Sequence, residues 1–197
     1  MFLANNITLH GTLIGLWLAT WLVSELSFIT YALARRSSTS PGRGGDRGSG
    51  LLIFLSIGVA IGVNLGATRS GLGPMLSLWA LVPGSVLLAL GIGIRGWAIL
   101  TLGREFSLVV RTTEDQKLIE RGPYAFVRHP AYTGSLLTVL GFAFFVGNAV
   151  GIAVTLVVVV PAFLYRIGVE ETALRLRFPL EYQRYTERTW RLLPGVY

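Results

Sequence analysis

Residues 149–176 read AVGIAVTLVVVVPAFLYRIGVEETALRL, an apolar run with no charged residue before Arg166. A transmembrane helix needs about 20 predominantly apolar residues, so this run predicts a helix that crosses a bilayer. Its last third contains the charged residues, which predicts that the helix extends beyond the membrane on the cytoplasmic side. Pro161 lies within the run and predicts a bend, because proline removes one backbone hydrogen bond of a helix.

Four further apolar spans precede this one. The fourth is short, and the turn signal Gly147-Asn148 joins it to the last span, so these two spans are expected to form an antiparallel hairpin. Pro83 lies near the outer end of the third span and predicts a kink or break there. The spans predict an all-α integral membrane protein with five transmembrane helices, which cover residues 7–34, 51–68, 76–102, 131–146 and 149–176.

The composition agrees with a single membrane domain over residues 1–197. Hydrophobic residues make up 52% of the chain and charged residues 14%, and the mean hydropathy is +0.62. An average soluble domain has roughly 25% charged residues, and a disordered chain has low hydrophobicity. The chain has no cysteine and only two histidines, His10 and His129. We therefore expect no disulfide, no cysteine nucleophile and no metal site.

The positive charge gathers on one side of the predicted membrane. The net charge is +7, and 15 of the 17 Lys and Arg residues lie in loop 35–50, in loop 103–129, or from Arg166 onward. The positive-inside rule then places the N-terminus outside and the C-terminus in the cytoplasm. We interpret the basic excess as topology and contact with anionic membrane lipids, not as nucleic-acid binding. The Gly/Ser-rich loop 35–50 is expected to be a flexible tether.

The segment RGPYAFVRHPAYTG, residues 121–134, is dense in turn and aromatic residues. His129 precedes a proline and is expected to be extended, and Pro130 suits the first position of the fourth helix. A helix that begins at the membrane surface presents free N–H groups to acceptor atoms. With the rings of Tyr124 and Tyr132, this arrangement suits a ligand that has a carboxylate and a flat ring. An interfacial belt of aromatic residues without a ligand is the alternative.

Acidic residues follow where the last span leaves the membrane. Arg166 and Glu170 are spaced i,i+4, as are Glu171 and Arg175, so each pair shares a helix face. The two pairs are either surface salt bridges of little energetic value or functional groups, because acids beside apolar helices are costly.

Glu25 and Arg95 lie at matching depths inside the first and third spans. Opposite charges buried at one depth should pair, which predicts contact between these two side chains. The alternative is that Arg95 extends alone to the surface.

Three motifs together resemble the isoprenylcysteine carboxyl methyltransferase family, part of a wider group that includes membrane phospholipid N-methyltransferases. The motifs are Gly-Pro-Tyr-x3-Arg-His-Pro-x-Tyr-x-Gly at 122–134, Glu170-Glu171, and FPLEYQRY at 178–185; LGREFS at 102–107 matches the approach to the first. The resemblance covers residues 90–194, which we interpret as a methyltransferase core with a cofactor-binding loop at 103–129 and a C-terminal tail. Residues 1–68 would be N-terminal anchor helices.

The resemblance implies an enzyme that uses S-adenosylmethionine and acts on a lipid-like methyl acceptor at the cytoplasmic face. Arg166 would face the acceptor. Two departures stand out: Gln116 replaces a His of eukaryotic members, and Phe178-Pro179 replaces Phe-Gly. Carried over by position, the residues that hold the cofactor would be Gln116, Lys117, Leu118, Ile119, Tyr124, His129, Pro130, Ala131, Tyr132 and Glu170.

The residues favour a carboxylate acceptor. A carboxylate is ionised at pH 7 and needs no general base, and an arginine such as Arg166 orients it bidentately. N-methylation of a phospholipid headgroup amine is the alternative within the enzyme class. A small membrane transporter or adaptor is the alternative outside it, although the repeated halves typical of transporters are not evident.

Overall fold

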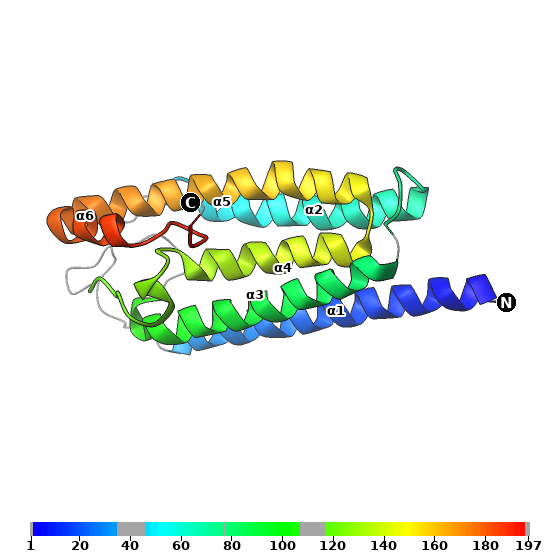
Figure 1. Ribbon diagram of the computed structural model, residues 1–197, viewed down its shortest axis with the longest axis horizontal. Helices are drawn as coiled ribbons and strands as arrows, with labels where there is room; N and C mark the ends of the chain where they lie inside the picture. Colours follow the sequence, from blue (N-terminus) through cyan, green and yellow to red (C-terminus); the bar gives the residue numbers. More distant parts are fainter. Residues whose placement is uncertain (1, 35–45, 77, 107–116, 196–197) are drawn as a thin grey trace.

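The computed structural model describes residues 2–34, 46–76, 78–106 and 117–195. Within these ranges every regular element is a helix, and strand-like pairing is limited to isolated bridges (Figure 1). The all-α expectation is thereby confirmed for the described residues. The elements are α1 (Phe2–Ala34), α2 (Ser49–Ser70), η1 (Leu78–Ala80), α3 (Leu81–Leu102), η2 (Gly103–Glu105), η3 (Gly122–Ala125), α4 (Pro130–Val146), α5 (Ala149–Arg177) and α6 (Pro179–Arg188).

The long helices form one elongated bundle. In Figure 1, α4 lies between the pair α1 and α3 on one side and the pair α2 and α5 on the other. The short helix α6 folds back beside the end of α5, at the end of the bundle where α4 begins. This end brings together the segment 121–134 and the charged residues in the last part of α5.

In the part of the chain that the structure describes, four helices are long and apolar enough to cross a membrane: residues Gly11–Tyr31 of α1, and all of α2, α3 and α5. The remaining apolar helix, α4, has 17 residues, so it extends about 25 Å against a hydrocarbon core of about 30 Å. The chain is a multi-pass integral membrane protein. Four of the five expected spans meet the length criterion, and the fourth is short, as its sequence predicted.

The third span begins later than the sequence predicted. The expected span starts at residue 76, whereas α3 begins at Leu81 after the short helix η1. Pro83 is then the third residue of α3 and lies in its first turn. Backbone N–H groups there have no hydrogen-bond partner within the helix, so the N–H that proline lacks is not needed. The expected span is thus interrupted just before Pro83, which agrees with the predicted kink or break near this proline.

The hairpin between α4 and α5 is confirmed. Gly147 ends α4 with a left-handed φ of 76°, a conformation that glycine adopts without strain. The side chain of Asn148 accepts a hydrogen bond from the Gly151 N–H at 3.0 Å and so caps α5. α5 then continues through Pro161 as one helix to Arg177.

Glycines allow α3 and α4 to approach closely. A Cβ on Gly91 would lie 2.3 Å from the Thr138 hydroxyl, and a Cβ on Gly134 would lie 2.6 Å from the Gly91 carbonyl oxygen. Gly84 and Gly141 make similar approaches seven residues away on each helix. Small residues are the usual means by which membrane helices pack backbone against backbone. This packing fixes the position of the beginning of α4.

The predicted contact of Glu25 with Arg95 is confirmed. Arg95 Nη2 donates to Glu25 Oε2 at 2.8 Å, and the side chains are 16% and 22% exposed, respectively. Arg95 also donates to the Ser135 hydroxyl of α4. The pair therefore connects α1, α3 and α4, and the alternative in which Arg95 extends alone was wrong.

Candidate active site

The first turn of α4 forms as its motif predicts. His129 is the N-cap residue and Pro130 the first helical residue. Both are buried, while Ala131 is half-buried. The proline fixes the backbone of the first turn and disfavours a helical conformation at His129, so the helix begins where the sequence places it.

The C-terminal segment after α6 lies along the approach to α4. The Arg128 N–H donates to the Trp190 carbonyl at 2.7 Å, and the His129 N–H donates to the Arg191 carbonyl at 3.1 Å. In return, the Trp190 N–H donates to the Phe126 carbonyl at 3.0 Å. Backbone hydrogen bonds therefore attach the end of the chain to the motif 121–134, a contact that the sequence did not predict.

Tyr132 joins α4 to the two charged residues of α5 that were predicted to act at the site. Its hydroxyl donates to Glu170 Oε2 at 2.6 Å and accepts from Arg166 Nε at 3.0 Å. The Tyr132 ring stacks on His129 with centroids 5.7 Å apart. It also meets Phe163 edge-on at 5.8 Å. The Tyr132 hydroxyl is therefore hydrogen-bonded both to the carboxylate of Glu170 and to the guanidinium of Arg166.

Arg166 is buried and contacts residues from the other end of the chain. Its side chain is 4% exposed and donates through Nη1 to Asp46 Oδ1. The same nitrogen donates to the Ser49 hydroxyl at 2.8 Å. Asp46 belongs to the loop 35–50, which the sequence analysis treated as a tether throughout. That interpretation was wrong for its last residues: α2 already begins at Ser49. An acid among the loop's arginines was the only signal.

Glu171 is a buried carboxylate with several charged neighbours, and it was not among the predicted site residues. The expected contact with Arg175 exists at 3.0 Å, but Glu171 is 0% exposed, so the surface-salt-bridge alternative was wrong for this residue. Its carboxylate also accepts from Arg128 Nε at 3.2 Å and from Arg191 Nη2 at 2.6 Å. His129 Nε2 lies 3.3 Å from the same carboxylate. One buried carboxylate therefore connects α4, α5 and the C-terminal segment.

The tyrosines of the motif 178–185 pack against the turn that precedes α4. The Tyr185 hydroxyl donates to the Tyr124 carbonyl at 2.7 Å, and the Tyr182 side chain is fully buried. Burial raises the pKa of the Tyr124 hydroxyl well above its ordinary value. Burial also raises the pKa of Tyr185. Both hydroxyls are therefore protonated at neutral pH.

The remaining predicted cofactor residues precede η3. Lys117 is exposed, and Leu118 and Ile119 are half-buried. Gln116 lies outside the described residues. The structure thus brings Tyr132, Arg166 and Glu170 into direct contact, with His129 stacked on the tyrosine.

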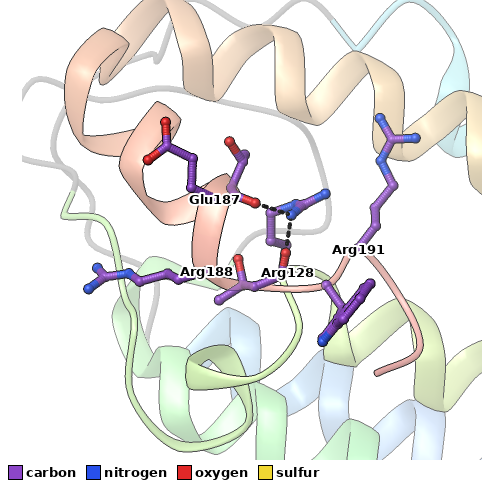
Figure 2. A pocket seen from close by; sticks show the side chains of 7 residues that line it. Arg128, Glu187, Arg188 and Arg191 are labelled. Carbon is purple, nitrogen blue, oxygen red and sulfur yellow. Dashed lines mark hydrogen bonds between the residues drawn. The ribbon is translucent and has the colours of Figure 1, made fainter. Parts of the chain in front are cut away.

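Figure 2 shows a surface cavity of about 380 Å³, whose lining includes Arg128 and Arg191, two residues that contact Glu171. Arg128 forms one wall and donates to the carbonyls of Thr186, at 3.2 Å, and Thr189. The volume lies in the range of small-molecule sites, which is about 300–1,000 Å³. The lining residues are Arg128, Thr186, Glu187, Arg188, Thr189, Trp190 and Arg191.

The chemistry of the site suits a cationic ligand with an aromatic part. Glu170 is half-buried and therefore reachable, and its carboxylate complements a sulfonium or ammonium group. The Tyr132 ring lies next to it and is stacked on the buried His129. Within the described ranges, no three His, Asp or Glu side chains gather in a way that would hold a metal ion.

Comparison with known proteins gives one consistent family. The sequence model described as the isoprenylcysteine carboxyl methyltransferase family matches residues 84–176. The chain is 37% identical over 115 residues to a probable protein-S-isoprenylcysteine O-methyltransferase of Oryza sativa subsp. indica. The aligned region covers 57% of this chain and 60% of that protein. It is also 34% identical over 115 residues to protein-S-isoprenylcysteine O-methyltransferase B of Arabidopsis thaliana. That aligned region covers 57% of this chain and 58% of the Arabidopsis protein.

A solved structure shares the fold. The structure of the eukaryotic intramembrane Ras methyltransferase, an isoprenylcysteine carboxyl methyltransferase, has a TM-score of 0.55 and 23% identity, and covers 75% of this chain and 51% of that one. The match spans about 60% of the length of the curated relatives. The resemblance seen in the motifs is therefore confirmed: residues 84–176, which include α4 and nearly all of α5, match the isoprenylcysteine carboxyl methyltransferase family.

Proposed function

We propose that this protein transfers a methyl group from S-adenosylmethionine to the carboxylate of a lipid-like acceptor of the isoprenylcysteine type. The observation that carries the proposal is the contact of Tyr132 with both Glu170 and Arg166. It places a residue suited to a cationic cofactor beside a residue suited to an anionic acceptor. The family match and the relatives named as O-methyltransferases support the same reaction.

Glu170 is the proposed partner of the cofactor's cationic end, and S-adenosylmethionine would supply an activated methyl group when bound. His129 and Tyr132 would provide the surface for its flat ring, and the first turn of α4 would provide N–H groups. The complete proposed set keeps the residues carried over from the family: Gln116, Lys117, Leu118, Ile119, Tyr124, His129, Pro130, Ala131, Tyr132 and Glu170.

Arg166 is the proposed partner of the acceptor's carboxylate. Arg166 would orient the acceptor's carboxylate toward the methyl group that bound S-adenosylmethionine would supply. Because a carboxylate is already ionised at neutral pH, the resulting methyl ester would need no proton transfer. Neither Glu170 nor Tyr132 has to act as a base, which is consistent with a hydroxyl that donates to a carboxylate at 2.6 Å. Alignment of the two reactants is then the main source of rate, and it can contribute about 7–11 kcal/mol.

The membrane arrangement completes the proposal. With the C-terminus in the cytoplasm, the end of the bundle that holds Arg166 and Glu170 faces the water-soluble cofactor. The acceptor's apolar tail remains among the helices. Residues 90–194 form the proposed methyltransferase core, in which loop 103–129 and the C-terminal segment cover the cofactor, and residues 1–68 form the anchor helices.

The proposal is tested with purified protein in lipid nanodiscs. Calorimetric titration with S-adenosylmethionine and S-adenosylhomocysteine should give saturable binding. Labelled methyl groups should then appear on an S-prenylcysteine acid and not on its methyl ester, which has no free carboxylate. Transfer to phosphatidylethanolamine alone would support N-methylation instead. A folded sample that binds neither cofactor form would refute methyl transfer altogether.

A further inference from the structure

A carboxylate of the protein itself lies at the residue proposed to receive the acceptor. Asp46 Oδ1 accepts from Arg166 Nη1. Asp46 Oδ2 accepts from the Gly50 N–H at 3.3 Å, and the Ser49 hydroxyl donates to Oδ1 at 3.3 Å. Asp46 thus contacts both the first turn of α2 and the arginine of α5.

The donors of Arg166 are engaged in a way that opposes a second carboxylate. A guanidinium carries five N–H groups, of which Nη1 has two. One is directed to Asp46, which precedes α2, and one to Ser49, the first residue of α2, while Nε donates to Tyr132. A bidentate fork to an incoming carboxylate needs two adjacent N–H groups. Because the side chain is only 4% exposed, a fork through Nη1 and Nη2 requires that Asp46 leave.

We propose that Asp46 is a specificity-determining residue: its carboxylate occupies the acceptor's place on Arg166, and the acceptor's carboxylate must displace it. This inference rests on the proposed function, in which Arg166 receives a carboxylate. Asp46 lies outside residues 84–176, the part that matches the family. It therefore adds a contribution from the N-terminal helices to the reaction centre.

The turn that carries Asp46 is suited to such a displacement. Asp46 is 27% exposed, in contrast to the buried Arg166. Arg47 follows it with a φ of 47° and Gly48 with a φ of 72°. A left-handed conformation is unfavourable for a residue other than glycine, so the backbone by itself does not favour this turn.

The competition selects for acceptors with a long apolar tail. Asp46 is attached to the same chain and so acts on Arg166 at a high effective concentration. A small free carboxylate can form the same ion pair with Arg166, but it lacks the high effective concentration of a group on the same chain. It therefore does not displace Asp46. An acceptor whose tail is buried among the helices gains binding free energy with each buried CH₂ group. Only such an acceptor can compensate for the loss of the internal ion pair.

The test compares the wild type with Asp46→Asn, saturated with S-adenosylhomocysteine in nanodiscs. Asparagine keeps the capping contact with α2 but not the negative charge. Calorimetry measures the affinity for S-prenylcysteine acids with one, two or three isoprene units, and for their methyl esters. The expected result is tighter binding of the acids by about 5- to 20-fold, by a similar factor for each tail length because the displaced ion pair is the same, with unchanged binding of the esters.

Controls separate this inference from the function on which it rests. Glu181→Gln removes an exposed acid of α6 and should leave the affinity for the acids unchanged. Asp46→Ser, a second uncharged capping variant, serves if Asp46→Asn does not fold. Unchanged or weaker acid binding in the Asp46 variants would overturn the inference while the proposed function stands. A wild type that binds S-adenosylhomocysteine but neither acid nor ester overturns both.

Discussion

Replacement of Glu171 by Gln should detach the C-terminal segment from α4 and destabilise the protein. Glu171 is fully buried, and the side chains of Arg128 and His129 that contact it are 13% and 3% exposed. Arg191, its third close partner, is 25% exposed. Glutamine has the same shape but no charge, so the guanidinium groups of Arg128 and Arg191 would remain close together without their counter-ion.

The magnitude follows from burial. Removal of one partner from a buried ion pair costs about 3–5 kcal/mol, because the remaining charge is uncompensated. Arg175 adds little, since its side chain is 55% exposed and exposed pairs contribute about 0–1 kcal/mol. For a domain of 150–250 residues, such a loss lowers the melting temperature by roughly 6–20 °C. Glu181→Gln, an exposed acid in α6, should stay within about 0.5 kcal/mol of the wild type.

Two measurements check this prediction. Thermal unfolding in detergent compares the Glu171→Gln and Glu181→Gln variants with the wild type. Hydrogen exchange follows the N–H groups of Arg128, His129 and Trp190, which are protected by the pairing with the C-terminal segment. We expect these amides to exchange faster in Glu171→Gln, with little change where α3 packs on α4. If both variants melt alike and the three amides stay protected, Glu171 does not hold this end of the protein together.

Glu170→Gln should weaken S-adenosylhomocysteine binding by roughly 10- to 100-fold without unfolding, the cost of a charge-assisted hydrogen bond; unchanged affinity in calorimetry would make this residue merely structural. Arg166→Ala should leave cofactor affinity largely intact and lower turnover, and a loss of affinity equal to that of Glu170→Gln would defeat the separate roles. Arg95→Leu should cost about 3–5 kcal/mol because Glu25 is left unpaired in the bilayer, and the double variant with Glu25→Leu should recover part of that loss in thermal unfolding. Burial raises the pKa of Tyr185 in the folded state, so the unfolded chain loses this proton first as the pH rises. The contribution of Tyr185 to the free energy of unfolding should therefore be constant below about pH 10 and fall above it, by up to about 1.4 kcal/mol per pH unit. Tyr185→Phe should reduce that slope in denaturant titrations between pH 9 and 11.

The sequence determined the helices because length and apolarity alone decide whether a segment can cross a bilayer. The run at 149–176 became α5, and the Gly147-Asn148 signal became the turn before it. Depth along a helix is also readable from sequence, since each residue advances a fixed distance. That is why the contact of Glu25 with Arg95 could be predicted from their spacing to the helix ends. Proline was less informative, because the consequence of Pro83 depends on whether the helix has already begun.

Only the tertiary structure decided which polar groups meet at the end of the bundle. Glu170 and Glu171 are neighbours in sequence, yet one contacts Tyr132 and the other is enclosed by Arg128, His129 and Arg191, because successive helical residues point about 100° apart. Asp46 reaches Arg166 from 120 residues away because α2 packs against α5, and no local pattern records such a contact. The attraction between two opposite charges is stronger where burial removes the competing water. Burial at these residues is a property of the packed helices, not of any one segment.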